Sequence, residues 1–220
     1  MNKVLIWIGV CIVLVVGAFF IFKNSVPPET QGTVPQPSKD TLTLSGGDIT
    51  LVLPVDFGLA TSAEQVPVKS YIPPCSEGFE YCFYYNNPQF QGTNFESAGL
   101  SIRHRAGLST QDACVTTMPD GYNNTEHVTQ SAEGYRAAMF AVGDAGAGHY
   151  ASGKVYRIAL STTCYEFETR IGETQFANYS PGSIKEFTAT DRATVELALA
   201  RILEHATLSS GATIVFPQGE

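Results

Sequence analysis

The sequence lacks the motifs that would assign a chemical activity. Its 220 residues contain no G-x-S-x-G nucleophile elbow, no H-E-x-x-H zinc helix and no calcium-loop pattern. No two cysteines have the C-x-x-C spacing, and no histidine stands at a zinc-like interval from a cysteine pair. No repeat of about 20 to 50 residues is present, which argues against a solenoid or a propeller. These absences favour a binding protein over an enzyme, and they predict no cofactor and no metal site.

Positive charge is scarce. Thirteen Lys and Arg stand against twenty-one Asp and Glu, giving a formal net charge of −8. Two of the positive residues, Lys3 and Lys23, flank an apolar segment, so the rest of the chain carries eleven positive against twenty-one negative residues, a net of −10. Such a field repels nucleic acid and anionic lipid headgroups. A nucleic-acid partner is therefore not expected.

One long hydrophobic run, Val4 to Phe22, lies near the amino terminus and contains no charged residue. As a helix rising about 1.5 Å per residue it would reach roughly 28 Å, close to the roughly 30 Å core of a bilayer. Residues 1–23 are therefore predicted to be a membrane anchor, with residues 4–22 inside the bilayer. Lys3 and the amino terminus place more positive charge before the run than Lys23 does after it, so we expect the amino terminus inside. The prediction is a single-pass protein of the cell membrane whose remainder is extracytoplasmic.

Two alternatives to the anchor remain open. A signal peptide cut after Ala18 would satisfy the small-residue rule through Val16 and Ala18, but residues 19–22 are apolar where a polar segment should begin. Cys11 is a second option, as a lipidated cysteine after cleavage, but Val10 is bulky where a small residue is expected. The length of the apolar run favours the retained anchor over both.

After the anchor, residues 24–40 are rich in Pro, Gln, Thr and Ser and show no apolar periodicity. They are typical of an extended, solvated linker. The remaining residues, 41–220, are enough for one domain with its own core and too few for two comfortable ones. We therefore expect one tethered domain.

Four cysteines follow the anchor, at Cys75, Cys82, Cys114 and Cys164. An even number suits two disulfides in an oxidising compartment. Three pairings are possible, and we favour Cys75 with Cys82 because they are close in sequence. Cys114 and Cys164 would then join a helix to a strand.

The hydrophobic pattern predicts an α+β fold, an antiparallel β-sheet with a short helix and a C-terminal amphipathic helix packed on it. A short helix is expected to begin at Ser109 and to end by Pro119, and the C-terminal helix to be capped by Thr190. Apolar residues at spacings of three and four, from Val195 to Ala206, mark the buried side of the C-terminal helix. The expected strands are 42–44, 49–53, 79–85, 100–105, 135–142, 154–160 and 164–171, with closing strands at 207–208 and 212–216. The polar, glycine-containing turn 45–48 between the first two predicts a β-hairpin.

Three segments carry a family resemblance: "ITLVLPVDFGL", "YRIALSTTCYEFETRI" and "VELALARILEHATLS". Their order resembles that of the elements in the PsbP/Mog1-like α/β/α sandwiches, over roughly residues 41–210. "GTNFESAGLSI" and "CYEFETRIG" look still more like small membrane-anchored bacterial proteins that are uncharacterised. Members of the PsbP/Mog1 group are mostly non-enzymatic binding or assembly factors, which is what the resemblance implies here. No functional residue carries over from it.

The segment Gly143 to Tyr150, "GDAGAGHY", offers Asp144, His149 and Tyr150 on a glycine-rich stretch. It follows neither the P-loop nor the dinucleotide-binding pattern. It is expected to be a mobile connection between strands, with a flexible active-site loop as the alternative.

Glu166 and Glu168 share one face of a predicted strand with Cys164 and Arg170, because residues two apart point the same way. Two neighbouring carboxylates can act as acid and base, as in glycosidases. The enzyme alternative is thus an extracytoplasmic hydrolase using Glu166 and Glu168 with His149. An exposed, charged sheet face is the more ordinary explanation.

The aromatic stretch "FEYCFYY", with Tyr71, Phe90 and Phe95 nearby, could form a platform for a carbohydrate or a peptide. One face of it, Phe79 to Tyr85 in steps of two, is expected to be core. The residues predicted to contact a ligand are Tyr84, Asn86, Asn94, His149 and Tyr150, with Asn87 as a further loop candidate. His104, His127 and His205 stand singly and are expected to be structural or exposed. The leading hypothesis is a membrane-tethered extracytoplasmic binding or assembly module for a protein, a small molecule or a glycan.

Overall fold

The computed structural model describes residues 40–122 and 127–218. The predicted membrane helix, residues 4–22, and the predicted linker up to residue 39 lie outside the described residues. Within the described ranges, no helix is both long and apolar enough to cross a bilayer.

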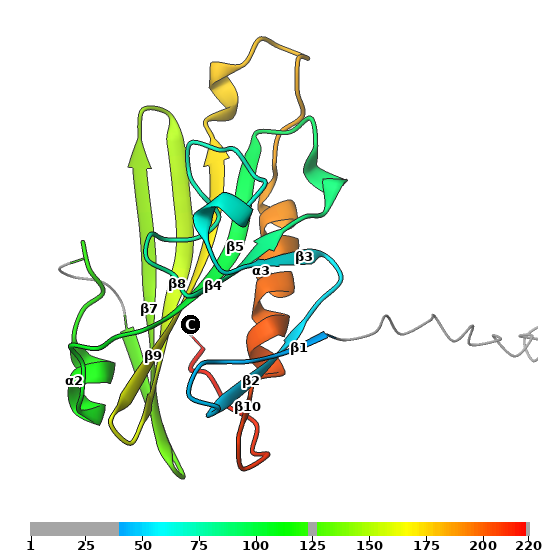
Figure 1. The fold of residues 1–220 in the computed structure, drawn as a ribbon. Helices are drawn as coiled ribbons and strands as arrows, with labels where there is room; N and C mark the ends of the chain where they lie inside the picture. Colours follow the sequence, from blue (N-terminus) through cyan, green and yellow to red (C-terminus); the bar gives the residue numbers. More distant parts are fainter. Residues whose placement is uncertain (1–39, 123–126, 219–220) are drawn as a thin grey trace, which may run out of the picture. The chain divides into compact units, whose positions relative to one another are not determined.

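The larger sheet has seven strands in the order β3-β4-β5-β9-β8-β7-β6, and every neighbouring pair is antiparallel (Figure 1). The strands are β3 (Phe57–Ala60), β4 (Tyr81–Tyr85), β5 (Phe95–His104), β6 (His127–Ala132), β7 (Tyr135–Gly146), β8 (His149–Leu160) and β9 (Thr163–Thr174). The three longest strands follow one another in sequence and are joined by tight turns. They form the part of the sheet on which the candidate site is built.

A smaller antiparallel sheet has the order β1-β2-β10. Its strands are β1 (Asp40–Thr43), β2 (Ile49–Leu53) and β10 (Thr207–Leu208). The described residues also form two α-helices, α2 (Gln111–Thr116) and α3 (Ala189–Glu204), and three short 3₁₀ helices, η1 (Ala63–Gln65), η2 (Pro88–Phe90) and η3 (Phe176–Asn178). Antiparallel sheets with few helices are the predicted α+β class.

The helix α3 begins two residues earlier than the sequence predicted. Thr188, not Thr190, is the N-cap, because its hydroxyl accepts a hydrogen bond from Asp191 N while the Asp191 carboxylate accepts one from Thr188 N. The buried stripe of α3 (Val195, Leu199, Ile202, Leu203) packs in one core with the side chains of β9 that point to this face (Tyr165, Phe167, Ile171).

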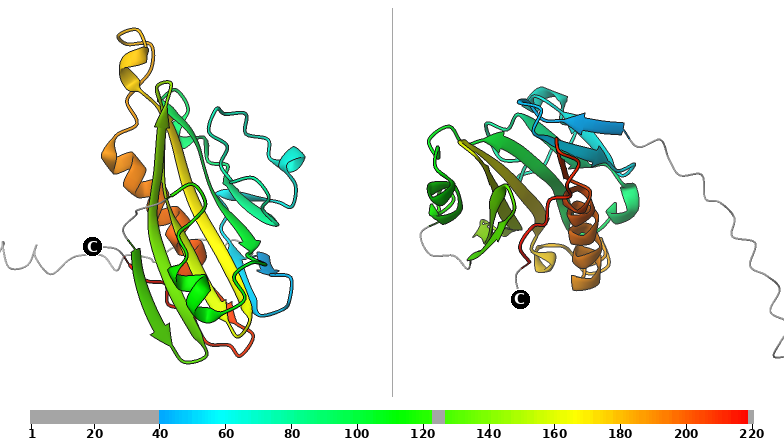
Figure 2. Two further views of the ribbon diagram at one scale, coloured as in Figure 1. Left: turned by 90° about the vertical axis from the view of Figure 1, so that its left-hand side faces the viewer. Right: turned by 90° about the horizontal axis from the view of Figure 1, so that it is seen from below.

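The helix α2 lies on the opposite face of the seven-stranded sheet, as the view from below shows (Figure 2). Its N-cap is Thr110 and not Ser109, since the Thr110 hydroxyl accepts a hydrogen bond from Ala113 N at 3.1 Å. Cys114 and Val115 of α2 form a second core with Phe140. The sheet therefore carries one helix on each face.

Both predicted disulfides are present. Cys75 bonds Cys82, and Cys114 bonds Cys164. The second one joins α2 to β9, which is the helix-to-strand link that the sequence suggested.

Several β-segments differ from the prediction. Segment 143–150 is no loop: β7 runs to Gly146, β8 starts at His149, and only Ala147 and Gly148 turn, at φ 51° and 81°. The expected strand 212–216 is reduced to an isolated bridge between Thr207 and Thr213. The short strands β3 and β6 were not expected, and β5 begins five residues before the predicted 100.

Candidate functional site

The carboxylates of β9 are buried, not exposed as the sequence predicted. Glu166 is 1% exposed and Glu168 is 9% exposed. The reason is that two elements cover this sheet face: α2 at one end, and residues 66–80 between η1 and β4. We call residues 66–80 the covering segment.

Glu166 is held by three arginines on the same sheet face. Its Oε1 accepts hydrogen bonds from Arg103 Nε at 2.7 Å and lies 3.4 Å from Arg105 Nη1. Its Oε2 accepts one from Arg157 Nε at 2.7 Å. Arg157 is fully buried, and this burial lowers the pKa of its guanidinium, against the attraction of Glu166. Both carboxylate oxygens are therefore engaged in ion pairs, which leaves Glu166 poorly suited to exchange protons with a substrate.

The structure does not bring together the three residues of the predicted hydrolase. Glu168 pairs with Arg170, at 2.7 Å between Oε1 and Nη2. His149 lies opposite Thr174 in the β8–β9 register, six residues along β9 from Glu168. At about 3.3 Å per residue this separates His149 from Glu168 by roughly 20 Å. No acid–base pair with a shared substrate position is formed by these residues.

The covering segment lies directly on the sheet because two strand positions are glycines. A Cβ at Gly99 would lie 2.7 Å from Pro74 O, and a Cβ at Gly172 would lie 3.0 Å from Ile72 Cβ. Glycine inside a strand commonly marks such a close approach. Only glycine allows this contact without displacing the segment.

Polar contacts and a disulfide hold the covering segment in place. Ile72 O accepts a hydrogen bond from Ser97 Oγ at 2.5 Å, and Ser76 Oγ lies 2.8 Å from Ser101 Oγ. The Cys75–Cys82 disulfide ties the segment to β4. The segment thus forms a fixed wall over one part of the sheet.

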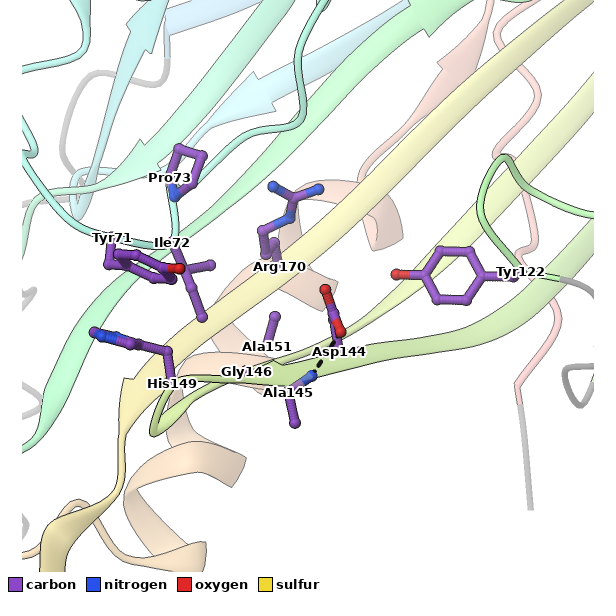
Figure 3. A pocket seen from close by; sticks show the side chains of 10 residues that line it. All are labelled: Tyr71, Ile72, Pro73, Tyr122, Asp144, Ala145, Gly146, His149, Ala151 and Arg170. Atoms are coloured by element: carbon purple, nitrogen blue, oxygen red, sulfur yellow. Dashed lines mark hydrogen bonds between the residues drawn. The ribbon is translucent and has the colours of Figure 1, made fainter. Parts of the chain in front are cut away.

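A cleft of about 300 Å³ opens between this wall and the end of the β7–β8 hairpin. Its lining residues are Tyr71, Ile72, Pro73, Tyr122, Asp144, Ala145, Gly146, His149, Ala151 and Arg170 (Figure 3). We call it the Tyr71 cleft. It is at the lower end of the range of about 300–1,000 Å³ that is usual for small-ligand sites.

The aromatic side of the Tyr71 cleft is a stacked pair. The rings of Tyr71 and His149 are 4.0 Å apart between centroids and inclined by 21°. His149 Nδ1 lies 3.0 Å from Glu96 Oε2, and because a carboxylate only accepts, Nδ1 carries the hydrogen. Tyr71 is 67% exposed, so its ring presents a large surface to solvent.

The polar side of the cleft consists of Asp144, Arg170 and Tyr122. Figure 3 shows the Asp144 carboxylate pointing into the space between the other two side chains. Burial, with a contribution from the negative charge of Glu168, raises the pKa of the Tyr122 hydroxyl above its ordinary value. The hydroxyl is therefore neutral at pH 7 and can donate as well as accept.

The other residues predicted to bind a ligand lie elsewhere. Asn94 is 5% exposed and was wrongly expected at the surface: its Nδ2 donates to Thr174 O and its Oδ1 accepts from Phe187 N, each at 2.6 Å. Tyr84 is half-buried, and its ring covers Gly58. These contacts give the side chains of Asn94 and Tyr84 a structural role.

Asn86 and Tyr150 are exposed but do not line the Tyr71 cleft. Asn86 lines a separate, more open hollow of about 460 Å³ near η2. Tyr150 follows His149 on β8, so its side chain points to the opposite face of the sheet. Of the five predicted contact residues, His149 is the one in the cleft.

Three isolated histidines take the places expected of structural or surface residues. His104 Nδ1 lies 2.8 Å from Glu80 Oε1, and the His127 ring stacks on Phe140 at 5.5 Å. His205 is exposed at the end of α3. Across residues 40–122 and 127–218, no three His, Cys, Asp or Glu side chains are grouped to hold a metal ion.

Sequence reasoning did not identify Tyr122 and Ile72 as cleft residues, and it treated Tyr71 as part of an aromatic patch. The available signal was the pair of glycines in the strands β5 and β9, at Gly99 and Gly172. They indicate where another backbone approaches the sheet, but not which segment does so.

Comparison with known proteins gives a partial structural match. No protein-family model matches the sequence. No curated protein matches it either. Among solved structures, the Ran-binding protein Mog1p of Saccharomyces cerevisiae is similar to it with a TM-score of 0.46 and 14% identity, covering 78% of this chain and 95% of that one.

Two further solved structures are similar to the chain. A single-substitution mutant of protein Mog1 has a TM-score of 0.46 and 14% identity, covering 78% of this chain and 96% of its own. LpqN, described as involved in cell envelope biogenesis of Mycobacterium tuberculosis, has a TM-score of 0.38 and 11% identity, covering 78% of this chain and 91% of its own.

Proposed function

We propose that this chain is a non-enzymatic binding module, tethered outside the membrane by residues 4–22, whose ligand enters the Tyr71 cleft. One observation carries the proposal: the cleft places an exposed aromatic ring beside Asp144 and Arg170, whose Oδ2, Nε and Nη1 have no hydrogen-bond partner among the described residues. The ring is held by His149, which is itself fixed by Glu96. A site that is already ordered loses little conformational entropy when a ligand binds.

The location outside the membrane is supported by the two disulfides. Cys75–Cys82 and Cys114–Cys164 are stable in an oxidising compartment and rare in a reducing one. The anchor is supported by the uncharged run from Val4 to Phe22.

Photo-crosslinking of the full chain in its native membrane tests the binding site. Tyr71→p-benzoylphenylalanine should give a light-dependent adduct, because this ring faces the cleft and is 67% exposed. Tyr150→p-benzoylphenylalanine is the matched control, since Tyr150 is also exposed but lies on the other sheet face. No adduct at position 71, or equal adducts at both positions, would contradict the proposal.

The tether is tested by intact-mass measurement on the membrane fraction. A retained anchor predicts an amino terminus at Met1 or Asn2. An amino terminus near Phe19 would instead mean that the segment is a cleaved signal peptide and that the domain is released.

A further inference from the structure

The exposed face of Tyr71 is suited to a flat apolar surface of a ligand. One face of its ring stacks on His149 at 4.0 Å, and the side chain is nevertheless 67% exposed. A pyranose ring has such a surface, formed by its axial C–H groups. A tyrosine ring offers apolar contact together with a polar hydroxyl at its edge.

The polar groups around Tyr71 have unused hydrogen-bonding capacity. Asp144 Oδ1 accepts from Ala145 N at 2.7 Å, whereas Oδ2 has no partner within the described part of the chain. Arg170 uses Nη2 for Glu168, and its Nε and Nη1 find no acceptor among residues 40–122 and 127–218. Neighbouring hydroxyls of a sugar can donate to a carboxylate and accept from a guanidinium at the same time.

The charge of the cleft argues against an anionic ligand. The positive charge of Arg170 is offset by Glu168 at 2.7 Å, and that of a protonated His149 would be offset by Glu96 at 3.0 Å. Asp144 has no cationic partner in the described ranges, and the whole chain carries a net charge of −8. A phosphate, a sulfated sugar or an acidic peptide would be repelled.

We infer that the Tyr71 cleft binds a neutral glycan, with one pyranose ring on Tyr71 and its hydroxyl groups on Asp144 and Arg170. The inference rests on the proposed function and names its ligand class. The cleft volume of about 300 Å³ gives room for a single pyranose ring with its substituents. The remaining sugar units of the oligosaccharide can extend into solvent through the open side of the cleft.

Titration of the purified full chain with neutral oligosaccharides tests the inference. The probes are cellotetraose, maltotetraose, galactotetraose and chitotetraose. Binding of each is measured by isothermal titration calorimetry in a detergent without a sugar headgroup. At least one probe should bind saturably. Tyr71→Ala should weaken that binding by about tenfold or more, since a stacking contact and its buried area are both lost.

Matched variants distinguish loss of the stacking contact with Tyr71 from a general effect on folding. Tyr71→Phe keeps the ring and should retain affinity to within about threefold, because only the hydroxyl at the ring edge is lost. Tyr150→Ala, on the other sheet face, should leave affinity unchanged. Asp144→Asn keeps the shape of the side chain and should weaken binding of the neutral probe. A glucuronic acid oligomer should bind more weakly than its neutral counterpart.

Two results would overturn the inference: no saturable binding of any of the four probes, or equal affinities of the parent and Tyr71→Ala. The crosslink at position 71 then tells which proposal has failed. An adduct that is a polypeptide, with no oligosaccharide binding, refutes the glycan and keeps the binding module. If neither an adduct nor binding is found, both proposals fail.

Discussion

Glu166→Gln removes the negative charge at the centre of the buried ion-pair network while keeping the volume of the side chain. Glu166 is 1% exposed and Arg157 is 0% exposed, so the variant leaves a buried guanidinium without its counter-charge. Within the described part of the chain, Arg157 would then have neutral acceptors alone: the carbonyl groups of Cys114 and Thr117 and the amide oxygen of the new side chain. Removing one partner of a buried ion pair costs about 3–5 kcal/mol of the free energy of unfolding.

For a domain of this size, 1 kcal/mol corresponds to a shift in Tm of about 2–4 °C, so Tm should fall by roughly 6 to 20 °C. Thermal unfolding should be followed by far-ultraviolet circular dichroism. The single tryptophan of the chain, Trp7, lies in the predicted anchor, so its fluorescence would not report on the domain.

Glu168→Gln is the matched control, on the same strand face two residues away. Its partner Arg170 has 24% of its side chain exposed and can be rehydrated, so we expect a loss of about 1 kcal/mol or less. If Glu166→Gln cost no more than Glu168→Gln, the reasoning about the buried charge would be wrong. A second check is Arg157→Met combined with Glu166→Leu, which should cost less than the sum of the two single changes.

Three further predictions concern the elements that frame the site. Replacing Cys114 and Cys164 by Ser should lower the free energy of unfolding by about 4 kcal/mol, because the bond closes a loop with a sequence separation of 50 residues. Urea unfolding of the oxidised parent and of the variant measures this difference. A change below about 1 kcal/mol would contradict the prediction. Thr188→Ala should cost about 1 kcal/mol in the same assay through loss of the α3 cap, and Thr188→Ser should restore most of it. The hydrogen bond from Arg105 lowers the pKa of Asp120 in the folded protein. The stability that this pair contributes is therefore fully present above the pKa of about 3.9 of the unfolded chain, and it is lost as the pH falls through the lower pKa of the folded protein. Because 74% of the Asp120 side chain is exposed, Asp120→Asn should lower the free energy of unfolding by less than about 1 kcal/mol at pH 7. The difference in Tm between the variant and the parent should shrink at pH 3. A difference that grows on acidification would refute the pairing.

Local signals were sufficient for the elements whose neighbours are close in sequence. The polar turn between β1 and β2 predicted their hairpin, and the apolar spacing from Val195 to Leu203 predicted the buried side of α3. Such signals depend on a few consecutive residues, so they can be read without knowing the fold.

The errors arose where the environment is provided by distant residues. Glu166 and Glu168 have the alternation of a half-exposed strand, and only the covering segment and α2, far away in sequence, bury them. Gly143 and Gly146 suggested a loop, whereas pairing with β8 holds them in a strand. The cleft residues come from four separate segments, so no short motif could have gathered them.

The two disulfides attach the covering segment and α2 to the same face of the seven-stranded sheet. Cys75–Cys82 holds the covering segment and Cys114–Cys164 holds α2, whereas α3 is retained on the other face by apolar packing. Reduction therefore acts first on the side that carries the Tyr71 cleft, because it removes both covalent attachments there, whereas the packing of α3 on the opposite face contains no disulfide.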